Sequence, residues 1–178
     1  MRRAALTLAL FALPLLASPA LGQGAQFGVK GIMLLPGEAY VEEFDNYVDI
    51  DLSLGAGVLV DTRLGERFLG GLYVDFMQAR AQDESGLLMD AGVSLKAALG
   101  SDQGKIRWRP GIGIGFGHLA QVGSLDASNY LTLRAGVEVV LPGGWLIEGS
   151  IYGAPTGGND DLTISYGPMP MLRFGRLF

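Results

Sequence analysis

The sequence predicts an all-β fold in which eight antiparallel strands follow one another as an up-and-down meander and close into a barrel. Apolar and polar residues alternate with a period of two in segments from Gln26 to the C-terminus, and that period is typical of a β-strand. Turn-forming residues separate the segments. An even number of antiparallel strands can close on itself and leave no unpaired edge.

The first four alternating segments cover residues 27–34, 48–60, 68–77 and 87–99. The first ends at Pro36-Gly37. The second carries apolar residues from Val48 to Val60 at even positions, with Asp49 and Asp51 on the other face. In the third and fourth segments, large apolar residues likewise face away from glycines, Asp75 and Asp90. Each segment therefore has one apolar face and one polar face.

The last four segments cover residues 106–117, 131–141, 145–153 and 162–178. In the fifth, glycine occupies every second position from Gly111 to Gly117. A nucleotide-binding loop is excluded because the spacing does not fit GxGxxG. The glycines therefore predict a strand with one bare face, which leaves room inside the barrel for bulky neighbours such as Tyr73 or Tyr152.

The connections between the segments alternate in length. Residues 61–67, 101–105 and 142–144 are short, whereas residues 36–47, 79–86, 119–129 and 154–161 are mostly longer and polar. Short turns at one end and longer loops at the other are typical of outer-membrane barrels, whose short turns face the periplasm.

The N-terminus predicts a cleaved secretory signal peptide over residues 1–22. Arg2 and Arg3 are followed by an apolar run from Ala4 to Ala17 and then by small residues. The apolar run is too short to span a bilayer. We expect cleavage after Gly22, with Ala20 as the alternative. The mature domain would then be residues 23–178, and loss of the two arginines would shift the net charge from −5 to −7.

The composition favours a membrane protein without a bound cofactor. The chain has no cysteine, so thiolate chemistry and disulfides are excluded. Its negative charge makes nucleic acid an unsuitable partner. Hydrophobic residues make up 49% of the chain and charged residues only 17%, which indicates that the outer surface as well as the interior is apolar. No metal site or cofactor site is expected.

Aromatic residues predict where the exterior meets the two membrane interfaces, because aromatic rings settle at that boundary. One girdle, at the short-turn end, consists of Phe27, Phe68, Trp108, Trp145, Phe174 and Phe178. Phe76, Phe116 and Tyr166 are expected on the same outward face at the opposite level.

The polar face predicts an interior filled with ion pairs, since an unpaired buried charge is unfavourable. Inward cations include Arg134, and inward anions include Asp75. The proposed lumen cluster consists of Lys30, Lys96, Arg107, Arg109, Glu138, Glu148 and Arg173.

The C-terminal segment Met171-Leu172-Arg173-Phe174-Gly175-Arg176-Leu177-Phe178 resembles the aromatic signature that outer-membrane barrels present to the barrel-assembly machinery. With the strand pattern, the chain resembles the small eight-stranded barrels of the outer membrane protein A and outer membrane protein X type. The resemblance implies an outer-membrane location in Gram-negative bacteria, porin-like architecture, outer-membrane lipid and the assembly machinery as partners, and interior ion pairs that plug the lumen and gate slight conductance.

Three features depart from that family pattern. Arg176 shares the outward face of Phe174 and Phe178, which an interface position tolerates. Pro168 and Pro170 interrupt the last strand, and Pro110 interrupts the fifth. Because proline removes a ladder donor, we expect a bulge or an extension beyond the bilayer at these prolines.

Two features have the residue types of a catalytic site. His118 is placed like the histidine of barrel enzymes that remove acyl chains from lipid A, but Ala120 stands where their serine would be, so a nucleophilic triad is not supported. Glu138 and Glu148 should lie opposite each other across a tight turn, like the paired carboxylates of glycosidases. An eight-stranded interior leaves little room for substrate, which favours a salt-bridge cluster.

The sequence therefore predicts a non-enzymatic outer-membrane barrel with a structural or surface-contact role and at most minor conductance. The alternatives are a lipid A-modifying enzyme that uses His118 and a soluble lipocalin-like barrel that binds a ligand. The segment Glu38–Tyr47 is acidic and aromatic, but it has no calcium-loop spacing, so solvated surface charge is the stronger interpretation.

Overall fold

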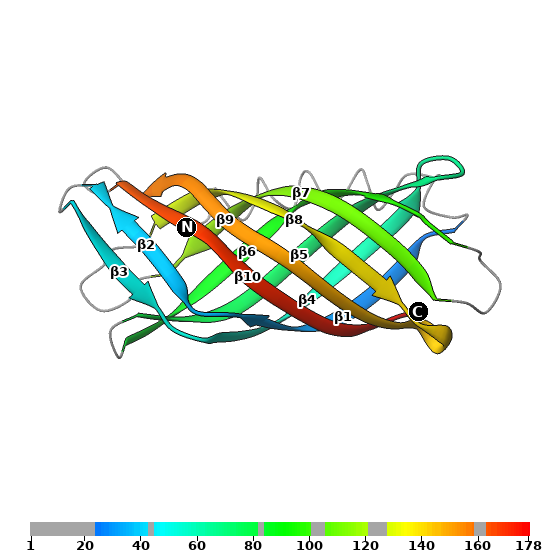
Figure 1. The fold of residues 1–178 in the computed structure, drawn as a ribbon, viewed down its shortest axis with the longest axis horizontal. Coiled ribbons are helices and arrows are strands. Elements are labelled where there is room, and N and C mark those ends of the chain that lie inside the picture. Colours follow the sequence, from blue (N-terminus) through cyan, green and yellow to red (C-terminus); the bar gives the residue numbers. More distant parts are fainter. Residues whose placement is uncertain (1–23, 43–44, 82–83, 101–105, 121–127, 159–162) are drawn as a thin grey trace.

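The computed structural model describes residues 24–42, 45–81, 84–100, 106–120, 128–158 and 163–178. The expected signal peptide, with its cleavage sites at Gly22 and Ala20, lies outside the described residues. Within them, long tilted strands wrap around a common axis into a barrel (Figure 1).

Ten strands and one short 3-10 turn, Pro142–Gly144, make up the described structure. The strands are β1 Gln26–Leu34, β2 Gly37–Val41, β3 Asn46–Ile50, β4 Ser53–Arg63, β5 Phe68–Ala81, β6 Glu84–Ala97, β7 Arg107–Leu119, β8 Ser128–Val140, β9 Trp145–Gly158 and β10 Thr163–Leu177. All neighbouring strands pair antiparallel.

The barrel closes because β1 pairs with both β4 and β10, from Gly28 opposite Leu177 to Leu34 opposite Met171. From β4 to β10, each strand pairs with the next one along the chain. The strand β2 continues β1 along β10, and β3 continues β4 along β5. The wall therefore consists of eight long antiparallel strands in a meander, two of them interrupted, as the sequence predicted.

The two interruptions change which residues face inward, and here the sequence prediction was wrong. Beyond the break before β4, Val48 and Ile50 pack against the buried core, whereas Asp49 and Asp51 are exposed. The break is held by Asp51, whose amide donates to Arg80 and whose carbonyl accepts from the Ser53 hydroxyl. An irregular residue between two paired stretches reverses the inward and outward faces.

The strands also extend further toward the long-loop end than predicted. The segment expected as a loop at residues 36–47 forms the β2–β3 hairpin, in which the Tyr40 and Tyr47 rings are in contact, with 5.2 Å between centroids and 49° between ring planes. Most of the loops expected at 79–86 and 154–161 belongs to strands β5, β6 and β9. The hairpin therefore prolongs the wall beyond β1 and β4.

The prolines produce two different irregularities. The β9–β10 register shifts between Tyr166 and Met169, which is the bulge expected from Pro168 and Pro170. At Pro110 there is no such shift. The β6–β7 ladder stops at Gly111 and resumes as a single bridge at Trp108, while pairing with β8 continues through Pro110. The missing amide of Pro110 therefore faces β6, where the ladder is interrupted.

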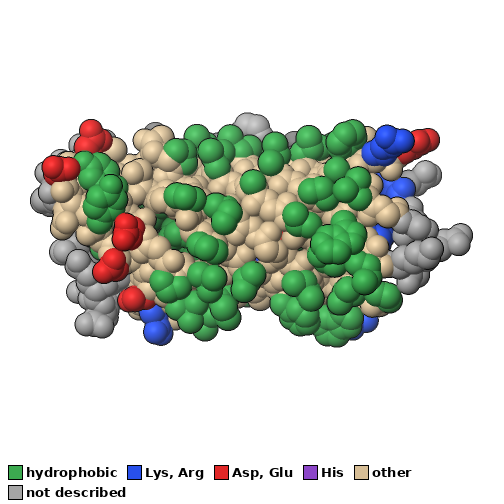
Figure 2. Space-filling model, viewed as in Figure 1, with side chains coloured by type: hydrophobic (Ala, Val, Ile, Leu, Met, Phe, Trp, Pro, Cys, Tyr) green, Lys and Arg blue, Asp and Glu red, His purple; other side chains and the backbone are tan. Residues whose placement is uncertain are grey.

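The exterior of the barrel is apolar. Large hydrophobic side chains are exposed over the whole wall, and Ile112, at 63% exposure, is among the most open of them. Figure 2 shows these side chains between an acidic end and a basic end. No helix among the described residues is long and apolar enough to cross a membrane.

Candidate functional site

The barrel interior holds the charged residues, which form two buried groups. The first, the Asp75 cluster, consists of Lys30, Asp75, Arg134, Glu148 and Arg173. Asp75 Oδ1 lies 3.0 Å from Lys30 Nζ, and Asp75 Oδ2 lies 3.4 Å from Arg134 Nη1 and 3.2 Å from Arg173 Nη2. Arg173 also pairs with Glu148 and donates to the Ser150 hydroxyl at 3.1 Å. One aspartate thus joins three cations.

The second group, the Glu138 cluster, consists of Asp61, Lys96, Arg109 and Glu138. Lys96 Nζ donates to Asp61 at 2.8 Å and to Glu138 at 2.7 Å. Arg109 Nη1 donates to Glu138 at 2.9 Å, and Arg109 Nη2 donates to the Gln26 side chain at 2.7 Å. Each carboxylate in this cluster has both lysine and arginine partners.

The two clusters balance their charge once Asp90 is included. Asp90 is fully buried and accepts a hydrogen bond from the Thr132 hydroxyl at 2.8 Å. Among the described residues, the two clusters and Asp90 together contain as many cations as anions. The cations are Lys30, Lys96, Arg109, Arg134 and Arg173, and the anions are Asp61, Asp75, Asp90, Glu138 and Glu148. Burial in a low-dielectric interior requires such compensation.

Glycines in the wall make room for these side chains. A Cβ at Gly115 would lie 2.3 Å from the Tyr73 hydroxyl and 2.7 Å from Asp90. The Tyr73 ring in turn lies under the Arg134 guanidinium, with 3.2 Å from Cζ to the ring centroid. The bare face of β7 is therefore filled by Tyr73 from β5, Asp90 from β6 and Thr132 from β8.

The long-loop half of the interior is apolar, which the sequence analysis did not predict. Leu34, Met77 and Tyr130 are almost fully buried there, and Met171 is completely buried. They belong to one continuous core with residues from the β2–β3 hairpin. The core leaves a cavity of about 40 Å³, which is close to the space of a single water molecule.

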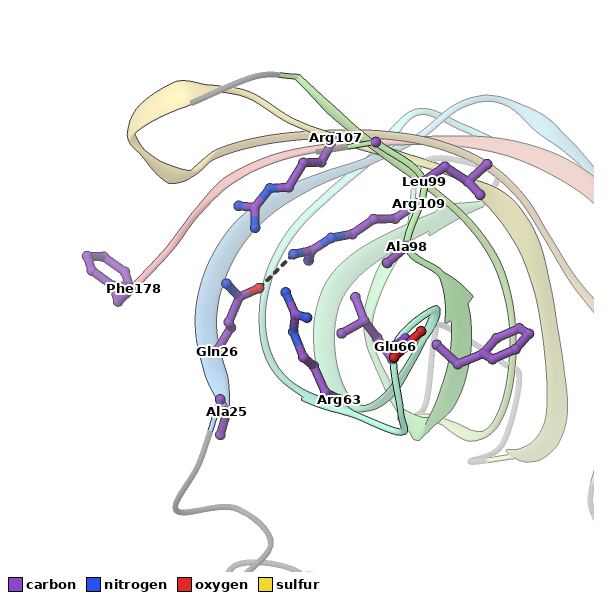
Figure 3. A pocket seen from close by; sticks show the side chains of 13 residues that line it. Ala25, Gln26, Arg63, Glu66, Ala98, Leu99, Arg107, Arg109 and Phe178 are labelled. Atoms are coloured by element: carbon purple, nitrogen blue, oxygen red, sulfur yellow. Dashed lines mark hydrogen bonds between the residues drawn. The ribbon is translucent and has the colours of Figure 1, made fainter. Parts of the chain in front are cut away.

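The short-turn end of the lumen forms an arginine-rich mouth with a cavity of about 350 Å³. Figure 3 shows Arg63, Arg107 and Arg109 extending toward the same opening beside Gln26. Arg107 was expected in the ion-pair cluster, but the structure places its half-buried side chain at this mouth. Arg107 therefore lines the entrance rather than the centre.

Glu138 and Glu148 occupy opposing positions on β8 and β9. They belong to different clusters, however, because Glu138 pairs with Lys96 and Arg109 whereas Glu148 pairs with Arg173. Each carboxylate is engaged by cations, and the cavity that both of them line has a volume of only about 20 Å³. The geometry is that of structural ion pairs rather than of an acid–base pair.

His118 lies on the exterior near the end of β7, where its Nδ1 is 2.9 Å from the Asn129 side-chain oxygen. An amide can orient an imidazole, but it supplies neither a nucleophile nor an acid. Among the described residues, no group of three or more His, Cys, Asp or Glu side chains is arranged to hold a metal ion.

All six residues of the aromatic girdle are exposed on the exterior: Phe27, Phe68, Trp108, Trp145, Phe174 and Phe178. Phe76 and Phe116 are exposed at the other level. Tyr166 was expected beside them, and this was wrong. Its hydroxyl donates to the Tyr130 hydroxyl at 3.0 Å and its ring packs on the interior core, because the bulge before Met169 turns this part of β10 inward.

Sequence reasoning missed Asp61 and Gln26 as interior residues. Asp61 was assigned to a turn, although it continues the inward alternation of Gly57 and Leu59 by one step. Extension of the alternation to the end of the strand would have found it. Gln26 stands directly opposite Asp61 on β1, and nothing in its local sequence indicates its contact with Arg109.

No protein-family profile matches the chain, and no curated protein matches it in sequence. Among solved structures, the outer membrane protein OprG of Pseudomonas aeruginosa is similar with a TM-score of 0.53 at 10% identity, over 87% of this chain and 96% of that chain. Ail, the attachment invasion locus protein of Yersinia pestis, has a TM-score of 0.49 at 13% identity, over 87% and 99% of the two chains.

Neisserial surface protein A has a TM-score of 0.49 at 10% identity, over 85% of this chain and 96% of that chain. At these identities the similarity concerns the fold, and OprG is the neighbour that supports it. Together with the pairing of β1 and β10 and the apolar exterior, it shows that the chain has the fold of the small eight-stranded outer-membrane β-barrels.

Proposed function

We propose that this chain is a non-enzymatic outer-membrane barrel whose lumen is blocked and whose role is structural or in contact at the cell surface. The observation that carries the proposal is the inverted distribution of polarity. Ion pairs and glycines occupy the interior, whereas large apolar side chains are exposed on the wall. This arrangement is stable when the wall contacts lipid.

Two layers support a blocked lumen. The balanced Asp75 and Glu138 clusters fill the middle of the barrel, and the apolar core fills the long-loop half. A solute would have to break buried ion pairs and then enter a layer that contains completely buried Met171. Both steps are unfavourable, so at most minor conductance is expected.

The orientation and the surface role follow from the two ends. We infer that the short turns face the periplasm, together with the start of β1 and the end of β10, while the β2–β3 hairpin projects away from the cell. The hairpin exposes acidic residues such as Glu38, Asp45 and Asp49, and it is the described segment best placed to contact a surface partner. During biogenesis, the strand that ends at Phe178 would engage the assembly machinery.

Two measurements test the proposal. In cell fractionation, the mature chain should be found in the outer-membrane fraction and should migrate differently on a denaturing gel before and after boiling, because a closed barrel resists unfolding. In proteoliposomes, it should not admit small sugars. A soluble periplasmic chain without heat-dependent mobility would support the lipocalin-like alternative, and rapid sugar entry would exclude a blocked lumen.

The lipid A-modifying alternative has its own test. Under our proposal, His118→Ala leaves the lipid A composition of isolated membranes unchanged, because Asn129 is the described hydrogen-bond partner of His118 and carries no nucleophile. A change in lipid A acylation that depends on His118 would establish the enzyme and overturn the non-enzymatic role.

A further inference from the structure

Arg176 is a cation on the apolar exterior. It is exposed on β10 between Phe174 and Phe178, which face the same way. Other arginines of the wall, such as Arg109 on β7 and Arg173 on β10, are buried in the lumen with carboxylate partners. Arg176 instead lies among aromatic rings, at a level where a guanidinium group is tolerated at a membrane interface. None of the ion pairs between described residues includes Arg176.

Aromatic rings hold Arg176 in place. Its Cζ lies 5.6 Å from the Trp145 ring and 5.6 Å from the Phe178 ring, which is the distance of a cation–π contact. Trp145 is itself stacked on Phe174 with 5.4 Å between centroids and 20° between ring planes. These ring contacts therefore hold the Arg176 guanidinium at the aromatic girdle, so that it does not extend into water.

A groove begins beside this arginine. The strand register places Phe174, Gly31, Ala56 and Phe76 in one row across the neighbouring strands β10, β1, β4 and β5. Two large rings thus flank two of the smallest side chains on the outer face. The resulting groove has a volume of about 550 Å³ and is lined at one end by Arg176, Trp145 and Phe178.

We propose that this groove binds one phospholipid of the adjoining leaflet, with its phosphate at Arg176 and an acyl chain over Gly31 and Ala56. The inference rests on the proposed placement of the wall in a membrane. The charge fits because a guanidinium binds phosphate oxygens through two parallel hydrogen bonds. The shape fits because the floor of small residues runs from the interface toward the apolar middle of the wall. An anionic lipid is favoured over a zwitterionic one.

Quenching of Trp145 fluorescence by brominated lipids tests this proposal. Trp145 and Trp108 are the two tryptophans of the chain, so the measurement uses the Trp108→Phe protein in phosphatidylcholine bilayers. Brominated phosphatidylglycerol or brominated phosphatidylcholine is added at equal mole fractions. We expect phosphatidylglycerol to bind about fivefold more strongly at the Trp145 site, the preference expected of one cation near an anionic headgroup.

Two matched pairs of variants separate the site from general effects. Arg176→Gln should abolish the preference, whereas Arg67→Gln, which removes an exposed charge from the β4–β5 turn at the same end of the barrel, should keep it. Gly31→Leu should fill the groove and reduce phosphatidylglycerol quenching to the phosphatidylcholine level. Gly149→Leu should not, because Gly149 is another outward glycine with open space but lies outside the groove.

The outcomes distinguish this inference from the proposed function. Heat-dependent gel mobility first shows whether each variant forms the closed barrel in the bilayer, and a parent chain that fails this step would contradict the membrane placement itself. If the parent inserts but quenching is equal for the two lipids, the lipid site is wrong and the barrel stands. Loss of the preference in Arg67→Gln as well as Arg176→Gln would also overturn the site, because it would indicate general charge attraction.

Discussion

Replacement of Asp75 by alanine should destabilise the barrel more than most single substitutions. Three cations lie 3.0–3.4 Å from its carboxylate oxygens. At an effective dielectric constant of about 20, each such pair contributes roughly 5 kcal/mol of attraction before desolvation is counted. Because desolvation opposes much of this, removal of one partner of a buried ion pair costs about 3–5 kcal/mol in net stability.

The assay is reversible urea unfolding of the barrel from phosphatidylcholine bilayers, followed by tryptophan fluorescence. Asp75→Ala should lower the free energy of unfolding by about 3–5 kcal/mol. The control Asp49→Ala removes the same side chain from an exposed position on β3 and should change stability by no more than about 0.5 kcal/mol.

A second substitution tests whether the loss of stability comes from the broken ion pairs of Asp75. Lys30 Nζ lies 3.0 Å from Asp75, so Lys30→Met should be less harmful in the Asp75→Ala background than alone, with a coupling energy of about 1–3 kcal/mol. If Asp75→Ala stays within about 1 kcal/mol of the unaltered protein, the carboxylate does not organise the lumen and the reasoning is refuted.

Three further predictions concern the wall. Gly115→Val should lower the free energy of unfolding and weaken the heat-resistant band, because a Cβ there would lie 2.3 Å from the Tyr73 hydroxyl, whereas Gly149→Val, with its nearest atom at 4.0 Å, should leave the band unchanged; equal folding of both would contradict the packing. Phe174→Ala should lower the unfolding free energy by about 1 kcal/mol beyond the effect of lost area, since it removes the stack on Trp145; a double-mutant cycle without coupling would show that the stack contributes nothing. Phe178→Ala should reduce assembly severalfold in proteoliposomes that contain the assembly machinery and leave spontaneous folding into thin bilayers unchanged; an equal loss in both would indicate a defect in the barrel itself.

The strands could be predicted because an apolar exterior around a polar interior imposes a strict alternation on each of them. Ile112, Ile114 and Phe116 illustrate this, since each is exposed on the wall as its position in the alternation requires. At the long-loop end the interior is also apolar, so the alternation of apolar and polar residues no longer shows which face of a strand points inward. Val48 and Ile50 could therefore be placed on either face from sequence, and the break before Ser53 decides the matter.

Most of the interior charges could be predicted, but Asp61 was missed, Asp49 and Asp51 lie outside instead, and the partners of the interior charges could not be predicted. Glu138 and Glu148 stand opposite each other on adjacent strands, which the tight turn between them makes evident. The contact of Lys96 with Asp61 joins residues 35 positions apart, and it depends on how the strands are staggered around the barrel. The stagger is a property of barrel closure rather than of any local segment, which also explains why Arg107 lines the mouth.

The most direct test of the inverted barrel is the accessibility of spin labels in a lipid bilayer. The chain has no cysteine, so single cysteines can be placed at Ile112, Ile114 and Leu133, which are 63%, 46% and 45% exposed on the wall. Our account predicts frequent collisions with oxygen and few with a water-soluble nickel complex at all three positions. Immobilised labels that neither reagent reaches would show that these side chains form a core. Labels that the nickel complex reaches readily would show that they face water. Either result would contradict the inverted barrel.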